Sequence, residues 1–335
     1  KEKYKDTLLE HTKANIEKMT DEGKALELEN IKKDLDLFRV KFDVYSFESA
    51  IRKSGAIEKA LKELESHIYV DNGAKILKTS EYLDDKDRPI VKSNGDFTYF
   101  LPDIAYHYDK LSRKFDYLID VLGADHHGYV NRMKSALMMK GYKKETLEVP
   151  LIQVVRLMDQ GVEVKMSKRT GNAITLKELC EEVGVDAVRY FFVARSNTSH
   201  LDFDYALAKS KTNDNPVYYA MYAHARLHNV LELGKGMKVD YSGKLLKEKS
   251  ELDILKTLQE FPHIVEIIAK SHEVHKLTIF IHSLATLIHS FYNECRIVNK
   301  ENLELTANRL GLVEASKIVL SNALSLIGVN APNKM

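Results

Sequence analysis

The feature that most constrains this chain is a change in its hydrophobic pattern near residue 213. Before that point, short apolar runs alternate with helical segments, a pattern typical of a parallel sheet covered by helices. After Asn213 the strand signals stop, and apolar residues recur only at helical spacing. We therefore predict an α/β domain over residues 1–212, followed by an all-α helical bundle over residues 213–335.

The first part of the α/β domain contains helical and strand-like segments. Helices are predicted at residues 1–30 and 48–66, and a strand is predicted at residues 35–45, where apolar and polar residues alternate. A β-rich insert follows at about residues 73–101, because turn formers such as Asn94-Gly95 separate short apolar runs. The predicted strands of this insert are 74–77, 90–92 and 98–101.

The second part of the α/β domain has the order expected of a Rossmann-like fold. An apolar strand at 117–122 leads through a turn at 123–128 into a helix at 129–140, and a second strand follows at 150–158. Such doubly wound sheets bind ligands beyond the carboxyl ends of their strands. Functional residues are therefore expected in the loops that follow these strands.

Two local signals mark where later helices begin. Thr175 and Glu178 form a predicted capping box, in which each side chain satisfies a free backbone N–H group. Asn215-Pro216 places a cap and a first-turn proline before the first helix of the bundle. The helices predicted for the bundle are 216–233, 250–270, 272–293 and 303–326.

Composition limits the setting in which the protein acts. The 50 basic and 49 acidic residues leave a formal charge of +1, which neither indicates nor excludes a nucleic-acid partner. Cys180 and Cys295 lack the spacing of metal ligands. We interpret them as buried, apolar residues of a protein that resides in a reducing compartment. No segment has the length and freedom from charge of a membrane span, and residues 1–5 do not resemble a signal peptide. We expect a cytoplasmic protein that does not enter a membrane.

The strongest functional signal is the segment Lys165-Met166-Ser167-Lys168-Arg169, followed by Thr-Gly-Asn. Two lysines three residues apart, with a hydroxyl between them and a glycine after them, form a cationic loop behind a strand. Such a loop suits a triphosphate, and above all the charge that builds on it during displacement. An arbitrary basic segment of this length is more often a solvated surface loop.

A second signal is Gly123-Ala-Asp-His126-His127-Gly-Tyr at a strand end. Adjacent histidines raise the possibility of zinc, but no further ligand follows at metal spacing, and we predict no metal site. Glycines beside polar residues at the carboxyl end of a strand fit nucleotide and substrate contacts better. A purely structural turn is the alternative.

A third signal combines two separated acids. Asp103 lies in Tyr99-Phe-Leu-Pro-Asp-Ile-Ala-Tyr-His107, and Glu48 lies further upstream in Tyr-Ser-Phe-Glu-Ser. Carboxylates at strand-to-helix junctions can bind a guanidinium bidentately, which is the strongest geometry for recognising arginine. From the pattern alone, either acid is more often a helix cap.

Together these segments resemble the arginyl-tRNA synthetases, which are class I aminoacyl-tRNA synthetases. The cationic loop is shared by several class I enzymes, whereas three further segments make the resemblance specific and extend it over nearly the whole chain. These segments are Val188–Ser196, His200–Asp204 and Asn215–Arg226, and the terminal Ala-Pro-Asn-Lys-Met335 is also similar.

The resemblance implies roles for individual residues. Glu48, Tyr99, Asp103 and His126 match positions that hold the arginine side chain. ATP is expected to contact Gly123, His127 and the loop residues Lys165, Met166, Ser167 and Lys168, with Lys165 and Lys168 as the catalytic pair. The helical domain matches the anticodon-binding domain, where Tyr222 and Met335 are candidate tRNA contacts or, equally, packing residues. The implied substrates and cofactors are L-arginine, ATP with Mg²⁺ and tRNA(Arg), and we expect a monomer.

The chain departs from the family in one respect. Class I enzymes carry a His-x-Gly-His signature that contacts ATP, and none of the 13 histidines stands in such a string. We therefore expect a fragment that lacks the amino-terminal end of its catalytic domain and that is inactive by itself. Two alternatives remain open: a tRNA-binding module without activity, and another class I synthetase such as the cysteinyl enzyme.

Overall fold

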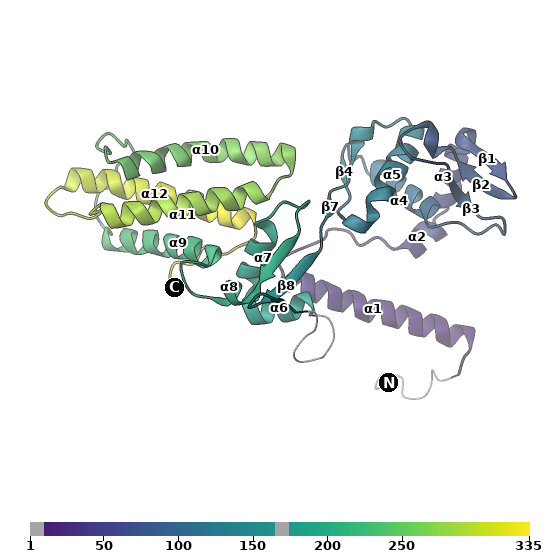
Figure 1. Ribbon diagram of the computed structural model, residues 1–335, viewed down its shortest axis with the longest axis horizontal. Coiled ribbons are helices and arrows are strands. Elements are labelled where there is room, and N and C mark those ends of the chain that lie inside the picture. Colours follow the sequence, from purple (N-terminus) through teal and green to yellow (C-terminus); the bar gives the residue numbers. More distant parts are fainter. Residues whose placement is uncertain (1–9, 165–173) are drawn as a thin grey trace. The chain divides into compact units, whose positions relative to one another are not determined.

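The computed structural model describes residues 10–164 and 174–335. The chain forms two compact units, each discontinuous in sequence. One unit comprises residues 42–154 and 197–200, and the other comprises residues 1–41, 155–196 and 201–335. Figure 1 labels the α-helices and several of the strands, and we describe each unit by itself.

The smaller unit begins with two short helices and an antiparallel sheet. Helices α2 (Glu48–Lys53) and α3 (Ala56–Glu63) precede a one-turn helix and three strands in the order β1-β2-β3. Each strand pairs antiparallel with the next. The bounds of these strands are β1 (Ile68–Asp71), β2 (Ala74–Leu77) and β3 (Arg88–Val91).

The remainder of this unit alternates strands and helices as predicted, but the predicted strand at 117–122 is divided into two short strands. The predicted strand at 150–158 is likewise divided, and its second part, at 155–159, belongs to the larger unit. Helices α4 (Phe100–Ser112) and α5 (His127–Met139) pack together, and the short strands between and after them pair in parallel, β4 with β6 and β5 with β7. A core that includes Leu101, Ile104 and Met133 lies beneath these elements. The strand bounds are β4 (Leu118–Ile119), β5 (Leu122–Gly123), β6 (Leu147–Glu148) and β7 (Leu151–Ile152).

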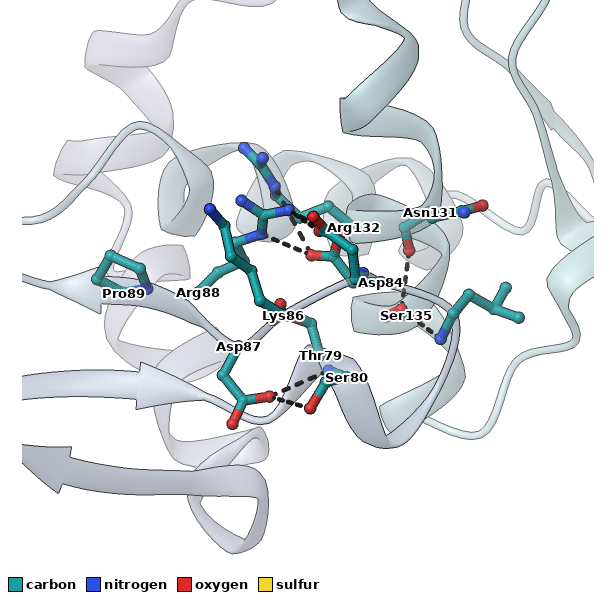
Figure 2. A network of polar contacts seen from close by, with 12 residues as sticks. Thr79, Ser80, Asp84, Lys86, Asp87, Arg88, Pro89, Asn131, Arg132 and Ser135 are labelled. Carbon is teal, nitrogen blue, oxygen red and sulfur yellow. Dashed lines mark hydrogen bonds and ion pairs between the residues drawn. The ribbon is translucent and has the colours of Figure 1, made fainter.

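The loop between β2 and β3 is held by a buried carboxylate (Figure 2). Asp84 accepts two hydrogen bonds from Arg88, at 2.8 Å from Nε and 2.9 Å from Nη2. The Ser135 hydroxyl of α5 accepts from the backbone N–H of Leu83 at 3.1 Å, which ties the loop to the helix. Although burial opposes ionisation, the hydrogen bonds from Arg88 and Asp85 lower the pKa of Asp84 to about 2.

This carboxylate should make the smaller unit sensitive to acid. The pKa of Asp84 is lower in the folded state than the ordinary 3.8, so its stabilising effect is present above pH 3.8 and is lost as the pH falls towards 2. We expect Asp84→Asn to lower the free energy of unfolding by about 2 kcal/mol at neutral pH. In urea unfolding of the two proteins, this difference should disappear near pH 2, and a difference that does not change with pH would contradict the assignment.

In the larger unit, one small sheet and three helices follow the long helix α1 (Lys13–Leu37). Strand β8 (Val155–Asp159) pairs in parallel with β10 (Leu201–Asp204) and antiparallel with β9 (Val162–Glu163). The predicted capping box is confirmed, since Thr175 and Glu178 each bond the other's backbone N–H. The helices here are α6 (Leu176–Val183), α7 (Val185–Val193) and α8 (Tyr205–Lys209).

Four long helices complete the larger unit and lie side by side (Figure 1). They confirm the predicted bundle, and Asn215 caps the first of them through its side chain, with Pro216 at the first helical position. Their buried side chains, which include Phe280, Ile281 and Leu320, form one core with those of α6 and α7. The helices are α9 (Pro216–Leu233), α10 (Lys249–Ser271), α11 (His275–Glu294) and α12 (Leu303–Leu326).

The predicted strand at residues 35–45 is wrong. Helix α1 continues to Leu37, and Arg39 then adopts a left-handed φ of 61°. The segment pairs with no strand, and the carbonyl group of Phe38 instead accepts a hydrogen bond from Arg189 at 2.6 Å. One apolar residue of the segment does pack against the core: the centroid of the Phe38 ring lies 6.0 Å from that of the Phe192 ring.

The predicted strand at residues 98–101 is also wrong. Thr98 keeps a single backbone hydrogen bond to Ile90, but Tyr99 is already helical and α4 begins at Phe100. Pro102 favours this outcome because its ring suits the first turn of a helix and cannot donate to a strand ladder. A four-residue apolar run cannot distinguish strand from buried helix by its pattern.

Candidate active site and tRNA-contacting residues

Asp103 lies in the first turn of α4 and faces α5. Its Oδ2 accepts a hydrogen bond from the Tyr129 hydroxyl of α5 at 2.5 Å. Burial, together with this hydrogen bond, raises the pKa of Tyr129 well above its usual value. Tyr129 therefore stays neutral and donates a hydrogen bond to Oδ2 of Asp103, and Oδ1 of the same carboxylate can accept from a cationic ligand. Tyr129 ends the motif that begins at Gly123, and no role was predicted for it.

The other proposed arginine contacts lie at the starts of helices. Tyr99 is the residue before α4 and is 85% exposed, so its ring is available to a ligand. Glu48 opens α2, where its Oε1 lies 2.6 Å from Nη2 of Arg52. The Glu48 carboxylate is exposed, so binding of a substrate guanidinium would have to compete with this local ion pair.

The turn after β5 places Gly123, His126 and His127 at the start of α5. His126 precedes the first helical residue, His127, and no side chain caps the free N–H groups of this helix end. A Cβ at Gly123 would lie 2.6 Å from Oδ1 of Asp125, but this exposed side chain can move aside and the φ of Gly123 is −68°, so the turn does not by itself require glycine. An exposed, uncapped helix start favours negatively charged or polar groups of a ligand.

Beneath this region, α4 is joined to the strands by a buried polar cluster. His107 is 4% exposed, and its Nε2 lies 2.6 Å from Oδ2 of Asp120. Lys110 binds Oδ1 of the same carboxylate at 2.7 Å. Burial raises the pKa of Asp120, but its interactions with His107 and Lys110 prevail and lower it to about 2. Sequence reasoning missed this cluster, although His107 ends the motif that contains Asp103.

The cationic loop predicted from Lys165, Met166, Ser167 and Lys168 lies outside the described residues. The structure describes its flanks: β9 ends at Glu163, and the capping box at Thr175 starts α6. A small cavity of about 30 Å³ lies beside these flanks and is lined by residues such as Leu157, Val164 and Tyr205.

In the helical bundle, Tyr222 belongs to an aromatic and cationic group on α9 and α11. Its ring stacks on Tyr218 with centroids 6.1 Å apart, and the guanidinium of Arg226 lies 4.5 Å from its centroid. The Arg226 guanidinium is also 4.7 Å from the Tyr292 ring and 3.1 Å from Nδ1 of His289. Stacked rings beside a guanidinium are suitable for contact with unpaired nucleotide bases.

The end of the chain returns to α9. Nδ1 of His224 lies 2.8 Å from the carbonyl oxygen of Pro332, and burial is the main reason that the pKa of His224 is lowered. Met335 follows three residues later and is exposed. The tail is therefore anchored on the same helix that carries Tyr222.

Comparison with known proteins identifies the family. Residues 6–209 match the model described as tRNA synthetases class I (R), catalytic domain, and residues 220–335 match the DALR anticodon binding domain. The chain belongs to the class I (R) tRNA synthetase family. The family model is that of the R enzymes, so the alternative of another class I synthetase is not supported.

Relatives and solved structures agree with this family. The chain is 50% identical to arginine--tRNA ligase 2 of Bacillus thuringiensis subsp. konkukian, over 93% of this chain and 57% of that protein. It is 47% identical to arginine--tRNA ligase of Geobacillus kaustophilus, over 100% of this chain and 61% of that protein. A Campylobacter jejuni structure assigned as an arginyl-tRNA synthetase aligns with a TM-score of 0.88 and 33% identity. The alignment covers 97% of this chain and 71% of that chain. The chain thus spans about 60% of the length of these curated relatives.

Two further observations concern metals and membranes. Within residues 10–164 and 174–335, no group of three or more His, Cys, Asp or Glu side chains is placed to hold a metal ion. Within the same ranges, no helix combines the length and apolar character needed to cross a membrane.

Proposed function

We propose that this chain is part of an arginine--tRNA ligase that joins L-arginine to tRNA(Arg) through arginyl-adenylate. The observation that carries the proposal is the Asp103 carboxylate, held by Tyr129 in a chain that belongs to the class I (R) family. A partly buried carboxylate with one oxygen held by a neutral donor is suited to a guanidinium, and arginine is the amino acid that carries one.

In this proposal the arginine side chain is bound by Asp103, Glu48, Tyr99 and His126. Asp103 provides the negative charge at a site already oriented by Tyr129. Glu48 provides a second carboxylate once it exchanges Arg52 for the substrate. Tyr99 provides an exposed ring on which a planar guanidinium can stack.

Asp103→Asn tests this assignment because it keeps the size of the side chain and removes its charge. We expect arginine to bind roughly 10- to 150-fold more weakly, a loss of about 1.5–3 kcal/mol for one charge-assisted hydrogen bond. Isothermal titration of the full-length protein with arginine measures the change. Asp109→Asn, in the last turn of the same helix, is the matched control and should bind arginine normally. Equal affinity of Asp103→Asn and the wild type would show that Asp103 is only a helix-start residue.

We propose two chemical steps, neither with a covalent enzyme intermediate. The carboxylate of arginine attacks the α-phosphate of ATP, which enters with its Mg²⁺ ion, and pyrophosphate leaves. The terminal ribose hydroxyl of the tRNA then attacks the activated carbonyl, and AMP leaves. The protein acts by positioning and charge stabilisation. Gly123 and His127 would contact ATP at the start of α5, while Lys165, Met166, Ser167 and Lys168 would bind its phosphates.

The helical domain, proposed as residues 213–335, would bind the tRNA. Stacking of Tyr222 on Tyr218 beside Arg226 supports base contacts there, and Met335 lies on the tail anchored to α9. The domain is nearly neutral, with 14 basic and 12 acidic residues from 217 to 335, so phosphate contacts alone should give modest affinity. We propose a monomer that acts in the cytoplasm, and light scattering of the purified protein tests its mass.

Pyrophosphate exchange that depends on arginine separates this function from a tRNA-binding module without activity. The full-length protein should exchange pyrophosphate into ATP with arginine and not with other amino acids. Binding of tRNA without any exchange would favour the inactive module. Our expectation that the 335-residue chain is inactive by itself stays a prediction, and robust exchange by this chain would contradict it.

A further inference from the structure

His107 is the buried residue through which α4 is joined to the strands. It lies one helical turn after Asp103, and its Nδ1 is 2.7 Å from the carbonyl oxygen of Asp103. Its Nε2 is 2.6 Å from Oδ2 of Asp120, so the imidazole bridges the first turn of α4 and the segment between β4 and β5. Both distances are those of good hydrogen bonds.

The two acceptors determine the protonation of the ring. A backbone carbonyl oxygen can only accept a hydrogen bond, so Nδ1 must carry a hydrogen. The Asp120 carboxylate, whose pKa is lowered to about 2, is ionised at neutral pH and also only accepts, with Lys110 donating to its other oxygen at 2.7 Å. Nε2 must then carry a hydrogen as well. A neutral imidazole has a single N–H group, so this arrangement requires the imidazolium form.

Asp120 is in turn fixed to the sheet. Its backbone N–H donates to the carbonyl oxygen of Glu148 at 2.9 Å, which continues the parallel pairing of β4 with β6. Its side chain is only 12% exposed. Three residues further on, the chain reaches Gly123 and the turn that starts α5. His107 therefore links the backbone of Asp103 to Asp120, and so to the strand that leads to the proposed nucleotide turn.

The side chain of Asp103 is held separately from α5, by the Tyr129 hydroxyl at 2.5 Å. One contact orients the carboxylate and the other holds the backbone that carries it. Loss of the Tyr129 contact would free the side chain alone, whereas loss of the His107 contact would let the whole first turn of α4 shift. A shift of about 1 Å in a binding group can cost about a hundredfold in rate.

We propose that His107, as an imidazolium between Asp120 and the carbonyl oxygen of Asp103, is a positioning residue for arginine recognition. It touches no substrate and acts by holding the Asp103 carboxylate where the guanidinium binds. The proposal rests on the proposed function, in which Asp103 is the arginine ligand. Supporting partners behind a ligand-binding group typically contribute 10- to 100-fold in affinity in metal sites, and we expect a similar effect here.

The first test compares arginine affinities of the folded full-length protein by isothermal titration, with circular dichroism as the check on folding. His107→Gln should bind arginine roughly 10- to 100-fold more weakly, with unchanged affinity for ATP. Asp120→Ala should weaken arginine binding by a similar factor. Asp120→Asn should weaken arginine binding clearly less, because an asparagine amide can donate a hydrogen bond to a neutral His107 and keep the bridge in place. Ser112→Ala, on the same helix, is the matched control and should bind normally.

The second test measures the protonation of the ring directly, and its main observation is made on the wild-type protein. In protein labelled with ¹⁵N on histidine, the His107 ring should show hydrogen on both nitrogens at neutral pH, and Asp120→Asn should remove the hydrogen from Nε2. His107→Gln assigns the signals. A neutral His107 in the wild type would overturn the proposal, and so would normal arginine affinity of His107→Gln alongside weak binding by Asp103→Asn. Normal binding by Asp103→Asn would instead overturn the proposed function.

Discussion

Lys168→Ala in the full-length enzyme should form arginyl-adenylate roughly 30- to 1000-fold more slowly than the wild type, with little change in ATP affinity. The ammonium group would act mainly on the charge that develops on the phosphates in the transition state, an effect of about 2–4 kcal/mol. Single-turnover measurements of pyrophosphate release, at saturating ATP and arginine, separate this step from binding.

A matched lysine nearby serves as the control for Lys168. Lys177 lies in the first turn of α6 and is exposed. Lys177→Ala removes the same charge from the same part of the chain and should leave the rate unchanged. A Lys168→Ala enzyme with normal turnover and only weaker ATP binding would show that this lysine contributes uniform binding and not transition-state stabilisation.

Arg309→Met should lower the free energy of unfolding of the helical bundle by about 3–5 kcal/mol, the usual cost of leaving one member of a buried ion pair without its partner. Glu251 of α10 is fully buried, and its Oε1 lies 2.6 Å from Nε of Arg309 on α12. Its Oε2 accepts from the backbone N–H groups of Lys247 and Glu248, so the carboxylate cannot move to water without uncapping α10.

Urea unfolding followed by circular dichroism measures this loss in the whole chain. Lys249→Met is the control, since Lys249 lies on α10 with Glu251. Its ion pair with Asp253 is at the surface and should contribute almost nothing to the free energy of unfolding. Adding Glu251→Gln to Arg309→Met removes the unpaired charge but keeps the acceptor for the backbone, so it should recover part of the stability. Equal stability of Arg309→Met and the wild type would mean that Arg309 acts only as a packing residue.

Local patterns in the sequence determined the order of the main elements. The switch from α/β to all-α after residue 213, the Thr175 capping box and the Asn215-Pro216 helix start all proved correct. Each of these signals acts within one or two helical turns, since a cap or a first-turn proline affects the backbone next to it. The family resemblance was likewise visible in contiguous segments and was confirmed by the family models.

Tertiary structure decided what depends on partners distant in the sequence. The alternation at residues 35–45 suggested a strand, yet no strand lies beside it, and Arg189 bonds the carbonyl group of Phe38 instead. The ring of His107 contacts Asp120, which is 13 residues away and directly follows β4, a strand paired with β6. A single sequence specifies which groups can donate or accept, but only folding chooses their partners, and the partner determines a buried group's protonation and orientation.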